Sequence, residues 1–337
     1  NTCVFILMIR LPPRSTLFPY TSLFRSSCCC GLVSENFTIF GINSSYLTNR
    51  PKYINVGGRL LDLSVPKVMG IINVTPDSFY EGSRVSGERQ IIETAARMTD
   101  EGASVIDVGG VSTRPYAPDI AVEEEERRVL DAIRFIIREL PGTVISVDTF
   151  RASVARKAVE ECGALIINDI SGGEADSDMF SVVRELNVPY IMMHMQGTPR
   201  TMQENPVYED VVADILKWFS TKIYDLQSAG VKDILLDPGI GFGKSINHNF
   251  EILRRFHDFT IAGLPLVAGV SRKSMIWKTL GITPGEALNG TTVLNSVALM
   301  GGADILRVHD VKEAAESIKL INMLINRQDE TQKLTEK

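Results

Sequence analysis

Two carboxylates and one carboxamide stand where they could bind a polar ring. Asp148 and Asp237 each end a run of apolar residues, and Asn168 ends another. A carboxylate buried at the end of an apolar strand is energetically costly unless a group with several N–H donors pairs with it. That group is either an internal Arg or Lys, or a ligand whose ring carries an amino group beside a ring N–H. For a single Asp the two partners are about equally expected, and both carboxylates together with Asn168 favour the ligand.

Donor side chains near the ends of other apolar runs could bind an anion. These are Arg114, Lys273, Arg307 and His309. Arg307 and His309 are two positions apart, so their side chains point to the same side of an extended strand. Arg together with His suits a phosphate or a diphosphate. The sequence therefore predicts an anion site beside a pocket of hydrogen-bond acceptors.

Eight short apolar runs must position these side chains, and a segment of helical length follows each run. Strands that are apolar on both faces belong to a parallel sheet covered by helices, and their carboxyl ends meet at one rim. Eight such units predict an α/β fold, the (β/α)₈ TIM barrel, with its active site at that rim. Asp107 and His194 also stand at strand ends, and a structural hydrogen bond is the interpretation for both. The runs are Val68–Ile72, Ser104–Val108, Val144–Val147, Ala164–Ile167, Val188–Met193, Asp233–Leu236, Leu264–Ala268 and Asp304–Val308.

The predicted barrel occupies most of the chain. Residues 66–326 make it about 260 residues long, close to the roughly 250 typical of this fold. Residues 36–65 are interpreted as an N-terminal extension, in which Gly57–Gly58 joins two short strands into a hairpin that covers the bottom of the barrel. Residues 327–337 are interpreted as a polar tail, and Asp210–Ala229 has the apolar stripe of a helix packed on the sheet.

Residues 1–35 do not fit this organisation and are interpreted as a non-native, disordered leader. Four of the five cysteines lie there, and residues 5–26 resemble a translated sequencing adapter. No further Cys or His stands near them at the spacing of a zinc site.

The overall charge excludes one class of protein. A net charge of −6 without a clustered basic face argues against a nucleic-acid-binding surface. No apolar run approaches the roughly 20 residues that a membrane-spanning helix needs. We therefore expect a cytoplasmic enzyme that acts on small molecules and binds neither nucleic acid nor membranes.

Eight segments, in chain order, resemble the dihydropteroate synthase family of pterin-binding enzymes. They cover the whole predicted barrel: GIINVTPDSF (70–79), DVGGVSTRP (107–115), SVDT (146–149), INDI (167–170), MHMQGTP (193–199), LDPGIGFGK (236–244), SRKS (271–274) and RVHD (307–310). The resemblance implies a transferase of folate biosynthesis. It would condense 6-hydroxymethyl-7,8-dihydropterin diphosphate with p-aminobenzoate, giving 7,8-dihydropteroate and pyrophosphate, with the diphosphate leaving before the amine attacks.

The resemblance also implies a role for each site residue. Asn73, Lys273, Arg307 and His309 would form the catalytic group, with Asn73 as the protein ligand of a Mg²⁺ cofactor beside the diphosphate. Lys273 would also bind the pterin. The other substrate-binding residues would be Asp148, Asn168 and Asp237 for the pterin, and Thr113, Arg114, Ser271, Phe79 and Phe242 for p-aminobenzoate.

Further implications concern the loops and the assembly. Residues 75–85 and 112–121 would close over p-aminobenzoate, a compound that sulfonamides mimic, and a homodimer is expected. The chain departs from the family pattern at Glu81, Val111 and Tyr116, all three on the loops expected near p-aminobenzoate. Two alternatives stay open: a corrinoid-dependent methyltransferase domain that binds pterin, and a paralogue that binds pterin without catalysis.

Overall fold

A computed structural model of the chain describes residues 50–75, 84–112, 120–198, 201–202 and 206–335. The predicted leader at residues 1–35 lies outside these residues, as does most of each loop predicted to close over the site.

The predicted barrel is confirmed. Eight strands form one sheet in the order β8-β7-β6-β5-β4-β3-β10-β9, and every neighbouring pair is parallel. A parallel bridge between Leu236 and Leu266 joins the two edges of the sheet and closes the barrel. The strands are β3 (Lys67–Asn73), β4 (Val105–Gly109), β5 (Ile145–Asp148), β6 (Ile166–Asp169), β7 (Tyr190–Met193), β8 (Ile234–Asp237), β9 (Val267–Ala268) and β10 (Ile305–Val308).

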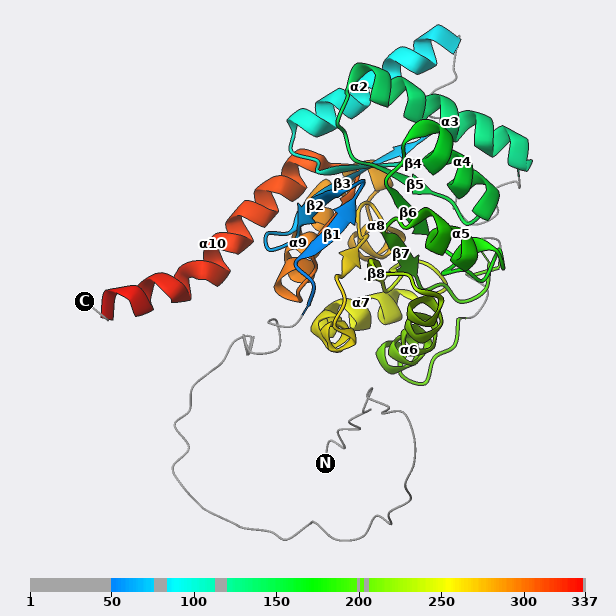
Figure 1. Cartoon of the computed structure of the whole chain (residues 1–337). Helices are drawn as coiled ribbons and strands as arrows, with labels where there is room; N and C mark the ends of the chain where they lie inside the picture. Colours follow the sequence, from blue (N-terminus) through cyan, green and yellow to red (C-terminus); the bar gives the residue numbers. More distant parts are fainter. Residues whose placement is uncertain (1–49, 76–83, 113–119, 199–200, 203–205, 336–337) are drawn as a thin grey trace, which may run out of the picture. The chain divides into compact units, whose positions relative to one another are not determined.

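Helices follow the strands and surround the barrel (Figure 1). α6 shows how their ends are set: Asp210 accepts hydrogen bonds from the backbone N–H groups of Val212 and Ala213, and Gly230 ends the helix with φ 95°. These are a side-chain N-cap and a left-handed C-cap. The helices are α2 (Arg84–Asp100), α3 (Val122–Glu139), α4 (Ala152–Cys162), α5 (Met179–Leu186), α6 (Val211–Ala229), α7 (Ile246–Arg254), α8 (Ser274–Leu280), α9 (Leu288–Met300) and α10 (Val311–Thr335), with 3₁₀ turns η2 (Phe256–Ala262) and η3 (Pro284–Glu286).

Side chains alternate between the two faces of each strand, which separates two hydrophobic cores. On β4, Ile106 and Val108 pack with the surrounding helices, whereas Val105 belongs to a second cluster inside the barrel. Because successive residues of a strand point to opposite faces, Asp107 points inward like Val105. The same alternation runs through the other strands and decides which polar residues reach the interior.

The N-terminal hairpin closes the lower end of the barrel, as predicted. β1 (Tyr53–Val56) pairs with β2 (Arg59–Asp62) around Gly57 and Gly58, both with positive φ. Ile54, Val56 and Leu63 are buried in the same cluster as the first inward residues of the barrel strands. The barrel interior is therefore apolar at this end, and its polar groups lie toward the opposite rim.

At the C-terminus the structure extends a predicted element. α10 continues to Thr335, beyond the boundary expected at residue 326, so most of the polar tail is helical. Among the described residues, none of the helices combines the length and apolarity needed to cross a membrane.

Candidate active site at the carboxyl rim

The polar residues of the rim form one layer inside the barrel. In this fold the inward side chains stack in layers of four, each contributed by alternate strands. One apolar layer consists of Val105, Ile166, Leu235 and Ile305, from β4, β6, β8 and β10. Two positions further along the same four strands stand Asp107, Asn168, Asp237 and Arg307. We call these four residues the polar layer.

A glycine leaves space beside the polar layer. A Cβ atom on Gly269, which follows β9, would lie 3.8 Å from Asp237 Oδ2, 3.9 Å from Lys273 Nζ and 4.0 Å from Arg307 Cβ. The side chains of three charged residues from three segments thus border one position without a side chain. This arrangement suits a flat polar ligand at the floor of the rim.

Arg307 connects the two sides of this space. Its Nε donates to Asp107 Oδ2 at 2.7 Å, and its Nη2 donates to Asp148 Oδ2 at 2.5 Å. Asn168 Nδ2 donates to the same Asp107 oxygen at 3.0 Å. Asp148 therefore pairs with an internal cation, the partner that the sequence left open, and Arg307 lies among the acceptor residues.

Burial dominates the electrostatics of Asp148. It raises the pKa of this carboxyl to about 7, while the positive charge of Arg307 acts in the opposite direction. The ionised carboxylate only accepts hydrogen bonds, whereas the protonated carboxyl also carries an O–H donor and accepts N–H donors less strongly, so a change of protonation near neutral pH changes how well Asp148 binds N–H groups.

Asp237 and Lys273 form the other side of the space. Asp237 Oδ1 accepts a hydrogen bond from Gly239 N at 2.7 Å, and burial raises the pKa of its carboxyl. Lys273 Nζ donates to the carbonyl of Ile240 and lies 4.2 Å from the centroid of the Phe242 ring. Burial lowers the pKa of Lys273 to about 8, and the charge of Asp237 opposes the shift. Phe242 is thus held next to the predicted pterin residues.

His309 and Ser271 contact each other at the rim. His309 Nδ1 lies 3.0 Å from Ser271 Oγ, which also accepts the backbone N–H of His309 at 3.1 Å. Burial and then Arg307 lower the pKa of His309 to about 4. His309 is therefore neutral at pH 7 and retains one ring N–H as a donor. Ser271 was expected beside p-aminobenzoate, but its hydrogen bonds hold His309, which was expected at the diphosphate.

Asn73 lies at the carboxyl end of β3 and is half-buried. It is level with Gly109 of β4, which in turn is level with Asp148 of β5. Within the described residues, His, Cys, Asp and Glu side chains form no group of three that could hold a metal ion.

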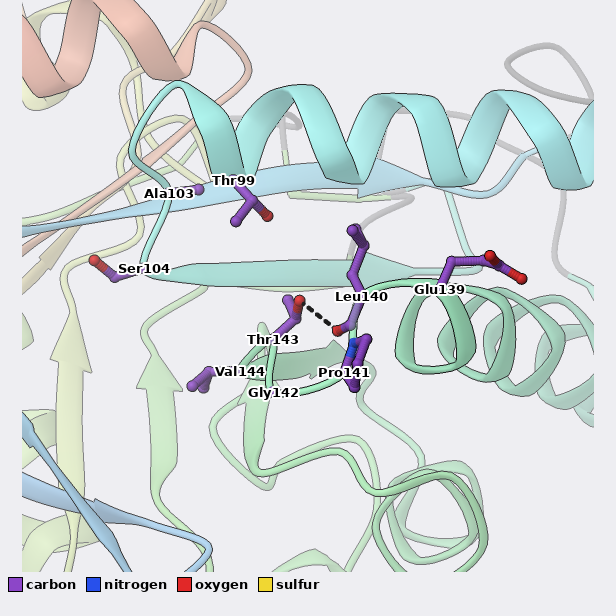
Figure 2. Close-up of a pocket in the computed structure, with 9 residues that line it drawn as sticks. All are labelled: Thr99, Ala103, Ser104, Glu139, Leu140, Pro141, Gly142, Thr143 and Val144. Atoms are coloured by element: carbon purple, nitrogen blue, oxygen red, sulfur yellow. Dashed lines mark hydrogen bonds between the residues drawn. The ribbon is translucent and has the colours of Figure 1, made fainter.

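A surface hollow away from the rim has a lining with few charged groups, unlike the polar layer. It has a volume of about 470 Å³ and lies where the chain enters β4 and β5, at the opposite end from the rim (Figure 2). Its lining includes Thr99, Ser104, Leu140 and Thr143, and Glu139 is the one ionisable residue among them. Because it contains none of the converging charges of the polar layer, the rim is the candidate site.

Comparison with known proteins decides the family. The model of the pterin binding enzyme family matches residues 69–309. Dihydropteroate synthase of Escherichia coli strain K12 is 43% identical over 271 residues, which cover 80% of this chain and 95% of that protein. The chain belongs to the dihydropteroate synthase family. The match to the family model extends from the first barrel strand to the end of the last one.

Solved structures of this family superpose on the chain. The Yersinia pestis dihydropteroate synthase with a sulfonamide drug complex has a TM-score of 0.76 and 36% identity, and covers 81% of this chain and 99% of its own. The Xanthomonas albilineans dihydropteroate synthase with 4-aminobenzoic acid has a TM-score of 0.75 and 36% identity, with coverages of 81% and 98%.

Not every residue that the family resemblance implies can be located. Thr113, Arg114 and Phe79 lie outside the described residues. The structure brings together five of the predicted residues: Asp148, Asn168, Asp237, Lys273 and Arg307. It also joins Ser271 to His309 and places Asn73 at the end of β3 on the same rim.

Sequence reasoning left two buried groups without a role. Asp107 is in the polar layer, and the signal that could have found it is its spacing of two from Val105 on an inward face. His194 pairs with buried Lys244, whose Nζ lies 3.0 Å from His194 Nδ1 and donates to the carbonyls of His194 and Phe242 at 3.1 and 2.8 Å. Both expected structural hydrogen bonds are present.

Proposed function

We propose that the chain condenses 6-hydroxymethyl-7,8-dihydropterin diphosphate with p-aminobenzoate, giving 7,8-dihydropteroate and pyrophosphate. The observation that carries the proposal is the convergence of Asp237, Lys273 and Arg307 around Gly269, next to Asp148 and Asn168. The aminopyrimidine edge of a pterin supplies N–H donors for such acceptors. The family and the E. coli relative agree with this assignment.

Binding of the pterin would change the partner of Arg307. Asp148 accepts from Arg307 Nη2 in this structure, and the N–H groups of the pterin would take that place. The freed Nη2 would then turn to the diphosphate on the adjoining side of the rim, toward His309. Bidentate guanidinium groups suit phosphate oxygens, which supports this change of partner.

The chemistry requires little proton transfer. The bond between the exocyclic methylene and the diphosphate oxygen breaks, and its electron pair leaves with the diphosphate. The lone pair of the neutral aromatic amine forms the new C–N bond, and the amine then loses a proton. Arg307 and the ring N–H of His309 would stabilise the charge that accumulates on the leaving group.

The residues present fit a Mg²⁺ ion that is bound mainly through substrate. Mg²⁺ in such sites keeps several waters and takes phosphate oxygens as ligands, with one or two oxygens from the protein. The carboxamide of Asn73 would hold it from the end of β3. When bound, the ion would neutralise charge on the diphosphate.

The p-aminobenzoate site is proposed above the pterin, near Phe242 and the loop that begins at Val111. A relative's structure contains 4-aminobenzoic acid, and another contains a sulfonamide drug complex. Val111 stands where the family pattern has Glu, and the other two departures, Glu81 and Tyr116, lie outside the described residues. Competition of a sulfonamide with p-aminobenzoate in the turnover assay tests whether this chain accepts the analogue.

One assay separates the candidate functions. The purified chain is mixed with Mg²⁺, the pterin diphosphate and p-aminobenzoate, and pyrophosphate release is followed over time. Release that depends on p-aminobenzoate supports the synthase. Pterin binding without release points to a paralogue without catalysis. A parallel reaction supplied with a methylated pterin and a corrinoid tests the methyltransferase alternative, which predicts methyl transfer there and no pyrophosphate release in the first mixture.

We also propose a homodimer that acts in the cytoplasm. α9 and α10 pack together, and both expose apolar side chains one helical turn apart: Val293 and Val297 on α9, Leu320 and Leu324 on α10. Neighbouring exposed apolar residues are typical of association surfaces. A charged diphosphate substrate does not cross membranes unaided, which favours the compartment where it is made. Sedimentation of the purified chain and fractionation of cells test these two proposals.

A further inference from the structure

We infer that Asp107 is a positioning residue, which orients both the pterin-binding carboxamide and the diphosphate-binding guanidinium through a single oxygen atom. The inference rests on the proposed function. Asp107 Oδ2 accepts from Asn168 Nδ2 at 3.0 Å and from Arg307 Nε at 2.7 Å. Asp107 is fully buried, so these contacts are shielded from solvent.

The topology explains why one residue reaches both partners. Asn168, Asp107 and Arg307 come from β6, β4 and β10, which are alternate strands of the barrel. Alternate strands contribute to the same layer, so the three side chains meet across the skipped strands β5 and β3. Asp107 is the middle residue of the three.

Contact with Asp107 decides which way the Asn168 carboxamide faces. A carboxylate only accepts hydrogen bonds, so the amide nitrogen of Asn168 must point toward it. The carbonyl oxygen of Asn168 then points away and is left as an acceptor for a ligand N–H. Asp107 would thereby make the pocket select a ring that presents a donor at this position.

The same oxygen fixes the plane of the Arg307 guanidinium. Nε is bound to Asp107, whereas the terminal Nη2 is bound to Asp148. When the pterin takes over Asp148, the Nε contact can remain while Nη2 changes partner. Asp107 is then the fixed point about which Arg307 reaches the diphosphate.

Two binding quantities separate these effects. The first is the affinity for 6-hydroxymethyl-7,8-dihydropterin, which lacks only the diphosphate. The second is the diphosphate increment, defined as the ratio of the affinity for the pterin diphosphate to that for 6-hydroxymethyl-7,8-dihydropterin. Asn168→Ala should lower the first and Arg307→Ala mainly the second, whereas Asp107→Asn should lower both, each by about 10-fold, as expected for loss of a charge-assisted hydrogen bond.

Double variants distinguish positioning from a general loss of structure. Asp107→Asn added to Asn168→Ala should cause little further loss of pterin affinity, and added to Arg307→Ala little further loss of the increment, because coupled residues are not additive. Asp304→Asn is the matched control, since Asp304 pairs with Arg50 at 2.7 Å and lies just before β10. It should change neither quantity.

Clear outcomes overturn the inference. Unchanged binding quantities in a folded Asp107→Asn protein would do so, and so would fully additive losses in both double variants. If Asp107→Asn does not fold, Asp107→Glu, which keeps the charge but moves it by one methylene, should still lower both quantities. Wild-type protein that binds the pterin diphosphate without releasing pyrophosphate contradicts the proposed function alone, because the couplings can still be measured by binding.

Discussion

Lys244 Nζ lies 3.0 Å from His194 Nδ1, and this buried contact joins the end of β7 to the glycine-rich turn after β8. At Gly239 the turn leaves no room for a side chain, because a Cβ there would lie 1.9 Å from the carbonyl oxygen of His194. Because the turn follows Asp237 and carries Phe242, the contact supports two residues of the candidate site from below.

Lys244→Met should therefore destabilise the fold. The substitution leaves the acceptors of His194 and Phe242 buried without a donor, which costs about 1–3 kcal/mol per unsatisfied group. We expect the free energy of unfolding, measured by denaturant titration, to fall by about 3 kcal/mol. Lys232→Met, at an exposed lysine, is the control and should have little effect. Equal stabilities of the two variants would contradict the role of the contact.

The pKa of Asp148 predicts how pterin binding depends on pH. Burial raises it to about 7, and the ionised carboxylate accepts the N–H donors of the pterin more strongly than the protonated carboxyl does, so affinity should increase as pH rises through about 7. Arg307 opposes the upward shift. Arg307→Ala should therefore move the midpoint to higher pH, whereas Arg307→Lys, which keeps the charge, should move it less. Calorimetric titration with 6-hydroxymethylpterin between pH 5.5 and 9 measures both midpoints, and a downward movement in Arg307→Ala contradicts the assignment.

His309 should remain neutral throughout the range in which the enzyme is assayed. Burial and the charge of Arg307 lower its pKa to about 4. Its imidazole resonances, followed by NMR, should titrate well below the ordinary pH range of a histidine, and Arg307→Ala should move that midpoint upward. A midpoint near 6.5 in the wild-type protein would show that the ring is protonated more easily than the geometry implies.

Gly269→Ala should separate binding from stability. The added methyl group would have its nearest neighbours at 3.8 to 4.0 Å, which are ordinary contact distances, so the fold should tolerate it. The methyl group would nevertheless occupy the space proposed for the pterin. We expect a loss of pterin affinity of about 10-fold or more, equivalent to about 1.4 kcal/mol. Gly285→Ala is the matched control, because its Cβ would meet only Thr283 Oγ1, at an ordinary contact distance of 3.8 Å. Unchanged pterin affinity in Gly269→Ala would move the ligand elsewhere on the rim.

The sequence predicted the barrel well because its signal is local. Each apolar run shows where a strand lies, and the polar residue that follows shows where the strand reaches the rim, as at Asp148 and Asp237. Alternation within one strand also indicates that Asp107 faces inward. These features depend on neighbours in the chain.

Contacts across the barrel were not predictable in the same way. Arg307 was expected with the diphosphate residues, yet it also binds Asp107 and Asp148, which are 200 and 159 positions away. Such contacts depend on how the eight strands are staggered, and strand order alone does not fix the stagger. The pairing of Lys244 with His194 was missed for the same reason. The extension of α10 beyond residue 326 was missed because an apolar pattern reports burial in the core, whereas this part of the helix continues by propagation from the turns before it.

Closure of the lower end by the hairpin affects the order in which substrates can bind and product can leave. Ile54, Val56 and Leu63 seal the interior beneath the polar layer, so the proposed pterin site is a well that is approached from the rim. A molecule bound between the pterin site and the rim would block the pterin from entering or leaving. The proposed second substrate reacts at the upper edge of the pterin, and would cover it. With the two substrates bound as proposed, the pterin diphosphate would have to bind before p-aminobenzoate, and the product would have to leave before the next pterin diphosphate binds.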